Sequence, residues 1–215
     1  MERSEIKAYL FDFDGTLVDS MPTYVSVMLR ILDENGVKYE DDIIKTITPL
    51  GYKGTAEYYR TLGVDLPVDK MVETMNEYAE EAYKFHVMDK DEVRDTLTVL
   101  KEKFSLNILT ASPHRLLDPC LKRLGLWDLF DNVWSCDDFN TTKADPKIHH
   151  MVADRLGVAV ENVAFVDDNI DAIKTAKKAG VFTYGIYDES SKDFIENMKK
   201  ESDSYVMTFG KLLEI

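Results

Sequence analysis

Two aspartates, Asp12 and Asp14, are two positions apart in the stretch YLFDFDGTLVDS, directly after an apolar run and before Gly15-Thr16. In an extended strand, residues i and i+2 point to the same face, so both carboxylates are expected to project side by side. Like charges held that close repel, and at least one is disfavoured as a carboxylate unless a positive charge lies between them. The pair therefore indicates either a shared proton or a bound cation.

The pattern beyond residue 100 indicates how such residues are positioned. Apolar runs rich in β-forming residues alternate with helical patterns, which predicts parallel strands joined by crossover helices in a sheet of about five strands. The strands are expected at 8–14, 106–110, 132–135, 162–168 and 181–186. Ligands of such sheets bind at the carboxyl ends of the strands. The acidic or polar residues at these ends are Asp12, Asp14, Thr110, Asp167 and Asp168.

The helices between these strands are predicted from apolar residues three and four positions apart. Asp118 and Pro119 are expected to begin one of them, and Gly125 follows its last apolar residue. His149 and His150 lie within another of these helices, and we expect both to lie on its surface.

The chain between Asp14 and Thr110 is far longer than a crossover requires. Apolar residues repeat with helical spacing over 21–32 and 68–83, and their methionines and aromatic residues are expected to form a separate small core. The sequence thus predicts an α/β fold, with a Rossmann-like parallel-sheet core over 1–17 and 89–215. A second, smaller, all-helical domain is expected over 18–88.

The charge balance of the chain limits its partners. Its 215 residues include 26 Lys and Arg against 40 Asp and Glu, a formal net charge of −14. This argues against a nucleic-acid binder, whose affinity depends on cationic contacts with phosphates, but it permits a small phosphate held by one metal ion and one lysine. The two cysteines form no disulfide framework, and no apolar run approaches the roughly 20 residues of a membrane span. We expect a cytoplasmic monomer or weak homodimer without a nucleic-acid or membrane partner.

Four motifs, in order, resemble those of the haloacid dehalogenase superfamily of phosphatases. They are DFDGTLVDS, NILTAS with Thr110, TTKADP with Lys143, and VAFVDDNIDAIKTAKKAGV with Asp167 and Asp168. The resemblance covers nearly the whole chain and is closest to the phosphoglycolate phosphatase and β-phosphoglucomutase branch, which has a helical cap after the first motif. Thr110 or Lys143 alone would be read as a strand-end threonine or a solvated lysine, so the signal lies in the ordered set.

The resemblance implies roles for these residues in phosphoryl transfer. Asp12 would be the nucleophile and would form an aspartyl-phosphate that water then hydrolyses. Asp14 would protonate the leaving oxygen and then deprotonate that water. Thr110 would bond a phosphoryl oxygen, together with the backbone N–H groups of Ala111 and Ser112.

Further positions in the motifs are expected to support the site. Gly15 would let the backbone approach the substrate closely, and Thr16 would help to position the turn. Lys143 would balance the aspartates, although Ala144 follows it where the family more often has proline. In the inserted domain, Lys53 is the expected substrate contact, together with its neighbour Tyr52; a surface lysine is the equal alternative.

The resemblance also implies Mg²⁺, a hard cation that takes oxygen ligands. The expected ligands are Asp12, the backbone carbonyl of Asp14, and an aspartate of the last motif. Adjacent residues of a regular strand face opposite ways, so Asp167 and Asp168 reach one metal only if the chain has begun to turn. We expect Asp168 to bind the metal directly and Asp167 to support it from behind.

The function expected is a Mg²⁺-dependent phosphatase of a small phosphorylated metabolite. A sugar phosphomutase of the same family is the first alternative, but those enzymes carry a phosphate-binding arginine after the Lys-Gly of the cap, and Lys53-Gly54 is followed here by Thr55. A non-catalytic phosphate- or metal-binding module is the second, and it predicts loss of a core group that this chain retains. A calcium loop is disfavoured because no closing glutamate follows the first motif at the required position.

Overall fold

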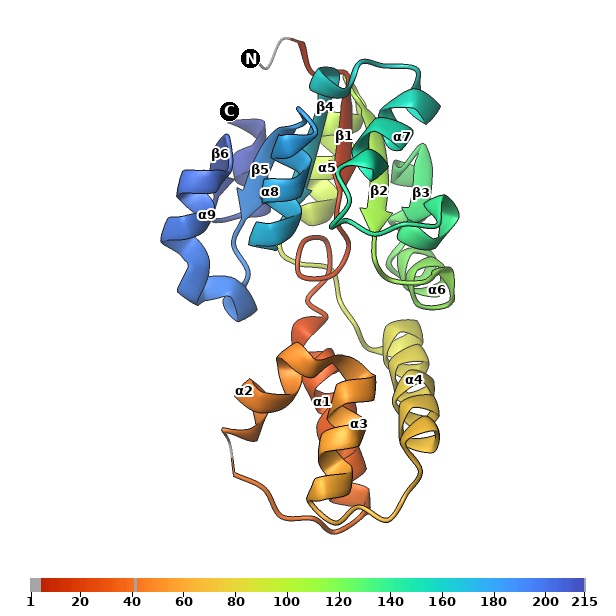
Figure 1. Cartoon of the computed structure of the whole chain (residues 1–215). Helices are drawn as coiled ribbons and strands as arrows, with labels where there is room; N and C mark the ends of the chain where they lie inside the picture. Colours follow the sequence, from red (N-terminus) through yellow and green to blue (C-terminus); the bar gives the residue numbers. More distant parts are fainter. Residues whose placement is uncertain (1–4, 41, 215) are drawn as a thin grey trace. The chain divides into compact units, whose positions relative to one another are not determined.

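The computed structural model describes residues 5–40 and 42–214. The chain divides into two compact units. Met1–Asp19 and Met88–Ile215 together form the first, here called the sheet unit, and Ser20–Val87 forms the second, here called the helical unit (Figure 1). That the helical unit acts as a cap, and that the sheet unit is a catalytic core, remain predictions.

The sheet unit contains a six-stranded sheet with the order β3-β2-β1-β4-β5-β6, and all neighbouring strands are parallel. Its strands are β1 (Ala8–Phe11), β2 (Ser105–Thr110), β3 (Asn132–Ser135), β4 (Val163–Asp167), β5 (Phe182–Ile186) and β6 (Ser204–Val206). The predicted α/β fold with a parallel sheet is confirmed. The sheet has one strand more than expected, because β6 is too short to show a periodic pattern.

Both faces of the sheet are covered, as a parallel sheet requires. The helices of this unit are α5 (Val93–Lys101), α6 (His114–Leu124), α7 (Lys147–Leu156), α8 (Ile170–Lys178) and α9 (Ile195–Glu201). Leu10 of β1 belongs to a buried cluster with residues of α7 and α8, such as Val152 and Ile173. Tyr9, next to it, points to the other face, where its ring packs against Phe104 and Tyr184. Figure 1 shows α8 and α5 on opposite sides of the sheet.

Helix α6 begins earlier than the sequence indicated. It starts at His114, so Pro119 lies inside the helix and Asp118 does not cap it. Proline removes one backbone hydrogen bond from a helix interior. The added turn, however, buries Leu116 and Leu117. The hydrophobic gain thus favours the longer helix, whose first residue follows directly on the loop after β2.

The helical unit contains α1 (Met21–Glu34), α2 (Ile43–Ile47), α3 (Gly51–Thr61) and α4 (Val68–Phe85). Three of its methionines pack in its own interior, as expected: Met28, Met71 and Met75 are fully buried. The hydroxyl group of Tyr59 on α3 donates a hydrogen bond to the Met28 carbonyl at 3.1 Å, which joins α3 to α1. No helix among the described residues is long and apolar enough to cross a membrane.

His149 contradicts the expectation of a surface residue. It lies on the buried side of α7 with 1% of its surface exposed, between the equally buried Ile148 and Val152. Its ring packs edge-on against Phe165 at 5.0 Å, and neither ring nitrogen has a hydrogen-bond partner among the described residues. Burial, with the nearby charge of Lys143, lowers the pKa of His149 from 6.5 to about 4. The imidazole is therefore neutral in the folded protein at neutral pH.

This burial makes stability depend on pH. Between the folded pKa near 4 and the unfolded value of 6.5, the unfolded chain binds a proton that the folded chain does not, so stability falls as pH is lowered through this range. We expect His149 to remove about 2 to 3 kcal/mol of unfolding free energy between about pH 7.5 and about pH 4.5. Urea unfolding of wild type and His149→Leu at both pH values measures it, with His150→Leu, an exposed neighbour, as control. The same pH slope in all three proteins would contradict the assignment.

Candidate active site

The site lies where β1, β2 and β4 end. Strands β1, β2 and β3 follow one another toward one side of the sheet, and β4, β5 and β6 follow one another toward the other side. The strand order therefore reverses between β1 and β4. Crevices at such points, beyond the carboxyl ends of the strands, are the usual ligand sites of open parallel sheets. Asp12 follows β1 directly, Thr110 ends β2 and Asp167 ends β4. These three residues therefore share one edge of the sheet.

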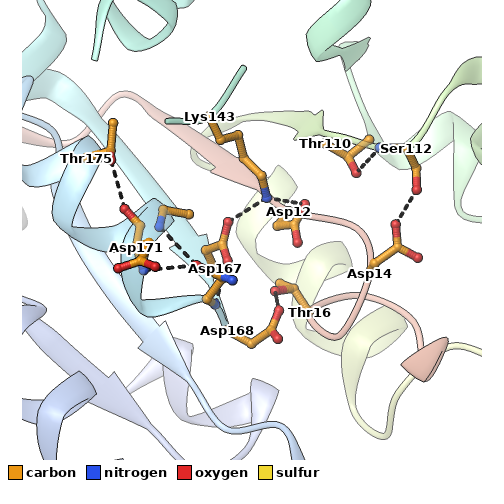
Figure 2. A network of polar contacts seen from close by, with 12 residues as sticks. Asp12, Asp14, Thr16, Thr110, Ser112, Lys143, Asp167, Asp168, Asp171 and Thr175 are labelled. Atoms are coloured by element: carbon orange, nitrogen blue, oxygen red, sulfur yellow. Dashed lines mark hydrogen bonds and ion pairs between the residues drawn. The ribbon is translucent and has the colours of Figure 1, made fainter. Parts of the chain in front are cut away.

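Lys143 lies between two of the aspartates (Figure 2). Its Nζ atom is 2.7 Å from Asp12 Oδ1 and 2.8 Å from Asp167 Oδ2. Burial alone would lower the pKa of Lys143, but the attraction of Asp12 and Asp167 outweighs it and raises that pKa. The lysine thus remains protonated and supplies a positive charge to the carboxylates.

Asp167 and Asp168 differ in their partners. Asp167 has both oxygens occupied: Oδ2 pairs with Lys143, and Oδ1 accepts a hydrogen bond from the Asn169 backbone N–H at 2.7 Å. Asp168 accepts a hydrogen bond on Oδ1 from the Thr16 hydroxyl at 3.0 Å. Among the described residues, no cationic group forms an ion pair with Asp168.

Gly15 makes room for Asp168. Its φ of +75° lies in the left-handed region that favours glycine. A Cβ atom at this position would be 2.6 Å from Asp168 Oδ2, too close for the carboxylate to keep its place. The sequence had suggested that Gly15 lets the backbone approach a substrate, and the structure adds this second reason for glycine.

Three buried aspartates form a candidate metal site. One oxygen atom each from Asp12, Asp167 and Asp168 lies within 4.8 Å of the others. Burial, together with the charges of Asp167 and Asp14, outweighs the opposing effect of Lys143 and raises the pKa of Asp12 to about 7. Burial and the neighbouring Asp167 and Asp12 also raise the pKa of Asp168 well above its ordinary value. Hard oxygen ligands with too little compensating charge suit a divalent cation.

Asp14 has a different partner from Asp12. The Ser112 hydroxyl donates a hydrogen bond to Asp14 Oδ2 at 2.5 Å, and Figure 2 shows Asp14 turned toward Ser112. The sequence predicted that the carboxylates of Asp12 and Asp14 lie side by side, as they would in a regular strand. The strand β1, however, ends at Phe11. The two carboxylates therefore lie in the turn that follows β1 and make separate contacts.

The loop after β2 presents polar groups next to Asp14. Thr110 is buried, and its Oγ1 accepts a hydrogen bond from the Ser112 backbone N–H at 3.0 Å. Ala111 is exposed and Ser112 is half-buried. The loop thus holds Thr110 and Ser112 together, on the side of Asp14 away from Asp168 (Figure 2).

Lys53 and Tyr52 belong to the helical unit. Both lie in the first turn of α3, where Lys53 is exposed and Tyr52 stacks on Tyr24 with ring centroids 5.3 Å apart. Their role as substrate contacts remains a prediction.

Two further charged residues of the sheet unit, Lys90 and His114, join separate segments of the chain. Lys90 contacts the Gly15 carbonyl and Asp188. His114, the first residue of α6, lies between Asp118 at 2.7 Å and Asp138 at 2.9 Å, and hydrogen bonds to these carboxylates raise its pKa. Each joins segments far apart in the sequence, so the contacts could be found only in the fold.

Curated relatives match most of this chain. A phosphorylated carbohydrates phosphatase of Thermotoga maritima is 27% identical over 178 residues, covering 82% of each chain. A phosphoglycolate phosphatase of Colwellia psychrerythraea is 30% identical over 197 residues, covering 86% of each. A crystal structure from Thermotoga maritima, of a protein named provisionally as a β-phosphoglucomutase, superposes with a TM-score of 0.83, 24% identity and 97% of both chains covered.

The family model for haloacid dehalogenase-like hydrolases matches residues 9–186, which include the four motifs, the whole helical unit and most of the sheet unit. The resemblance read from those motifs is therefore confirmed, and the six-stranded parallel sheet agrees with it. This chain belongs to the haloacid dehalogenase-like hydrolase family.

Proposed function

We propose that this hydrolase is a Mg²⁺-dependent phosphatase that acts on a small phosphorylated metabolite through an aspartyl-phosphate on Asp12. The observation that carries the proposal is the placement of Asp12. It is a buried carboxylate at the end of the central strand, held by Lys143 within a cluster of further aspartates. A covalent phosphoenzyme divides hydrolysis into two displacements at phosphorus, each needing a fixed nucleophile and neutralised phosphoryl oxygens.

Asp12 is suited to the first displacement because its orientation is fixed. Lys143 Nζ holds Asp12 Oδ1 at 2.7 Å, which restricts rotation of the carboxylate. The same ammonium group would attract a phosphoryl oxygen beside Asp12. A unit charge pair near 4 Å is worth about 4 kcal/mol at an effective dielectric constant of about 20, which is large enough to affect a transition state. Lys143 thus orients the nucleophile and stabilises charge on the group transferred.

Asp14 is suited to proton transfer because it is close to Asp12 yet has its own partner. As a general acid it would protonate the leaving oxygen, and as a general base it would then take a proton from the attacking water. In the free site its carboxylate accepts a hydrogen bond from the Ser112 hydroxyl group. Substrate binding must therefore exchange this hydrogen bond for one to the leaving group.

Mg²⁺ fits the aspartate cluster, with Asp12, Asp168 and the backbone carbonyl of Asp14 as the proposed ligands. When bound, it would neutralise phosphoryl oxygens during transfer. Asp168 is the better direct ligand, because Asp167 already has one oxygen on Lys143 and the other on a backbone N–H. Asp167 would then support the site through Lys143 and the turn that follows β4.

The substrate is proposed from the phosphate-binding groups and the names of the relatives. Thr110 with the backbone N–H groups of Ala111 and Ser112 would bind the phosphoryl oxygens. Relatives named as phosphatases of phosphorylated carbohydrates and of phosphoglycolate favour a small phosphate monoester. Lys53 would contact the remainder of such a molecule. The absence of a nucleic-acid or membrane partner, the cytoplasmic location and the monomer or weak homodimer remain predictions.

A sugar phosphomutase is the second candidate, since one structural neighbour carries that name. The residues after Lys53-Gly54 argue against it. Thr55 is fully buried and donates a hydrogen bond to the Ile47 carbonyl at 3.2 Å, and the next residue, Ala56, is also buried. No cationic side chain is available at these positions to grip a second phosphate.

Phosphate release from a panel of small phosphate esters tests the proposed function. We expect release that requires Mg²⁺, stops with chelator, and falls by about 10³-fold or more in Asp12→Asn, because the amide cannot form the phosphoenzyme. The exposed Asp193→Asn serves as the control and should keep wild-type rates. A folded wild type that binds metal yet releases phosphate from none of the esters would overturn the phosphatase in favour of a mutase or a binding module.

Gly15→Ala tests the metal site directly. The new methyl group would displace the Asp168 carboxylate, so we expect affinity for Mn²⁺, used as a paramagnetic substitute for Mg²⁺, to fall about tenfold or more. Gly36→Ala is the matched control, because Gly36 has a similar φ of +66° but open space around its Cβ position. Electron paramagnetic resonance of free Mn²⁺ measures binding without activity. Equal Mn²⁺ affinity in both variants would remove Asp168 from the proposed ligands.

A further inference from the structure

Lys90 lies in the segment that returns from the helical unit into the sheet unit, just before α5. Its side chain is about one-fifth exposed and meets three oxygen atoms. Nζ is 2.7 Å from the Gly15 carbonyl, 2.8 Å from the Tyr187 carbonyl and 3.0 Å from Asp188 Oδ2. A lysine ammonium has three N–H donors, so this environment uses all of them.

The Gly15 carbonyl belongs to the turn that carries Asp14 and Thr16. Within this turn, backbone hydrogen bonds run from Gly15 N to the Val18 carbonyl at 3.0 Å and from Leu17 N to the Phe13 carbonyl at 2.9 Å. The Thr16 hydroxyl group connects one side of the turn to Asp168 by a hydrogen bond. Lys90 fastens the other side through the Gly15 carbonyl, so the turn is held from two directions.

The backbone around Lys90 reinforces this contact. The Lys90 N–H donates to the Leu17 carbonyl at 3.0 Å, and the Asp19 N–H donates to the Met88 carbonyl at 2.9 Å. Val18 and Asp89 form an antiparallel bridge. The segments by which the chain leaves and re-enters the sheet unit are therefore paired, and the Lys90 side chain extends their pairing to the site.

Asp188 anchors Lys90 from the end of β5. Its side chain is 5% exposed, and its second oxygen accepts hydrogen bonds from the backbone N–H and the hydroxyl of Ser190. Despite burial, hydrogen bonds from Ser190 and the charge of Lys90 lower the pKa of Asp188. An ionised aspartate with all these donors holds the ammonium group in one place.

We propose that Lys90 is a positioning residue for phosphoryl transfer, which fixes the turn of Asp14, Gly15 and Thr16 against the metal-binding carboxylate Asp168. This inference rests on the proposed function. The competing explanation gives Lys90 a structural role only, as the charge partner of the buried Asp188.

The two explanations differ in the kinetic constants they affect. The proposed phosphate-binding groups, Thr110, Ser112 and Lys143, lie on other loops and do not contact Lys90 in the described structure. Releasing the turn should therefore leave KM within about twofold. It should lower kcat about tenfold to a hundredfold, because small displacements of a proton-transfer group and a metal ligand have large effects on the chemical step.

Lys90→Met removes the ammonium group and keeps most of the side-chain volume. Lys177→Met is the matched control, since Lys177 also pairs with an aspartate, Asp203 at 3.1 Å, and donates to a backbone carbonyl, that of Glu201. The double variant Lys90→Met/Asp188→Asn separates the two roles, because it removes the unpaired charge but does not restore the contact with Gly15. Each variant is assayed for kcat and KM with the best ester from the panel.

Amide hydrogen exchange gives a readout that does not require activity. The N–H groups of Gly15, Leu17 and Val18 are hydrogen-bonded within the turn, and those of β2 report on the stability of the whole unit. In Lys90→Met we expect exchange in the turn to rise about tenfold relative to β2, and in Lys177→Met we expect no change. If wild type hydrolyses no ester, the exchange rates alone decide whether Lys90 holds the turn.

The inference is supported by faster exchange in the turn, a lower kcat with KM retained, and a double variant as slow as Lys90→Met. It is overturned if Lys90→Met leaves exchange in the turn unchanged. It is also overturned if the double variant recovers wild-type kcat, because Lys90 would then only neutralise Asp188.

Discussion

The ion pairs of Lys143 with Asp12 and Asp167 are the interaction on which the site depends. Two carboxylates taken out of water at the end of a strand are unfavourable as anions unless a positive charge compensates them. Lys143 provides one charge at 2.7 and 2.8 Å, and it does so from a loop that neither β1 nor β4 contributes. Removing the lysine would leave two adjacent buried carboxylates, whose repulsion would favour protonation over nucleophilic or metal-binding states.

The parallel sheet is what makes this pairing possible. Because β1 and β4 are parallel neighbours, their carboxyl ends lie at the same edge of the sheet. Asp12 and Asp167 therefore lie close together although they are far apart in the sequence. The Asp12 backbone N–H still donates to the Val166 carbonyl at 2.9 Å, so the position of Asp12 is fixed by the end of the sheet ladder. The packed layers on both faces of the sheet thus determine the distance between the charged groups.

Sequence patterns predicted the parts of this arrangement that are local. Apolar residues repeat with a clear period in the longer strands and helices, and the sequence placed Asp12, Asp14, Thr110, Asp167 and Asp168 at strand ends. The strand β6 was not predicted, because a strand of three residues is too short to show a repeating pattern of apolar and polar residues. The start of α6 was misplaced because Pro119 was given more weight than the leucines before it.

The sequence patterns could not predict which distant residues a single charged side chain contacts. Nothing in the neighbourhood of Lys90 distinguishes it from the other lysines of an acidic chain, since its acceptors lie 75, 97 and 98 positions away. His149 was expected on a helix surface, yet in α7 it lies on the buried side together with Ile148 and Val152. The partner of a polar side chain is decided by packing between elements, which a single sequence does not display.

The ion pairs of Lys143 and Lys90, whose side chains are 14% and 21% exposed, indicate where negative charge in the site lacks a positive partner. Lys143 pairs with Asp12 and Asp167, and Lys90 pairs with Asp188, so each of these carboxylates has a cationic partner. Asp168, buried among them, has a hydroxyl donor from Thr16 and, among the described residues, no ion pair. Within the described part of the site, the negative charge without a cationic partner is therefore found at Asp168, beside Asp12. A divalent cation bound there would complete the electrostatic balance of the site and bring its positive charge to the place where phosphoryl oxygens need it.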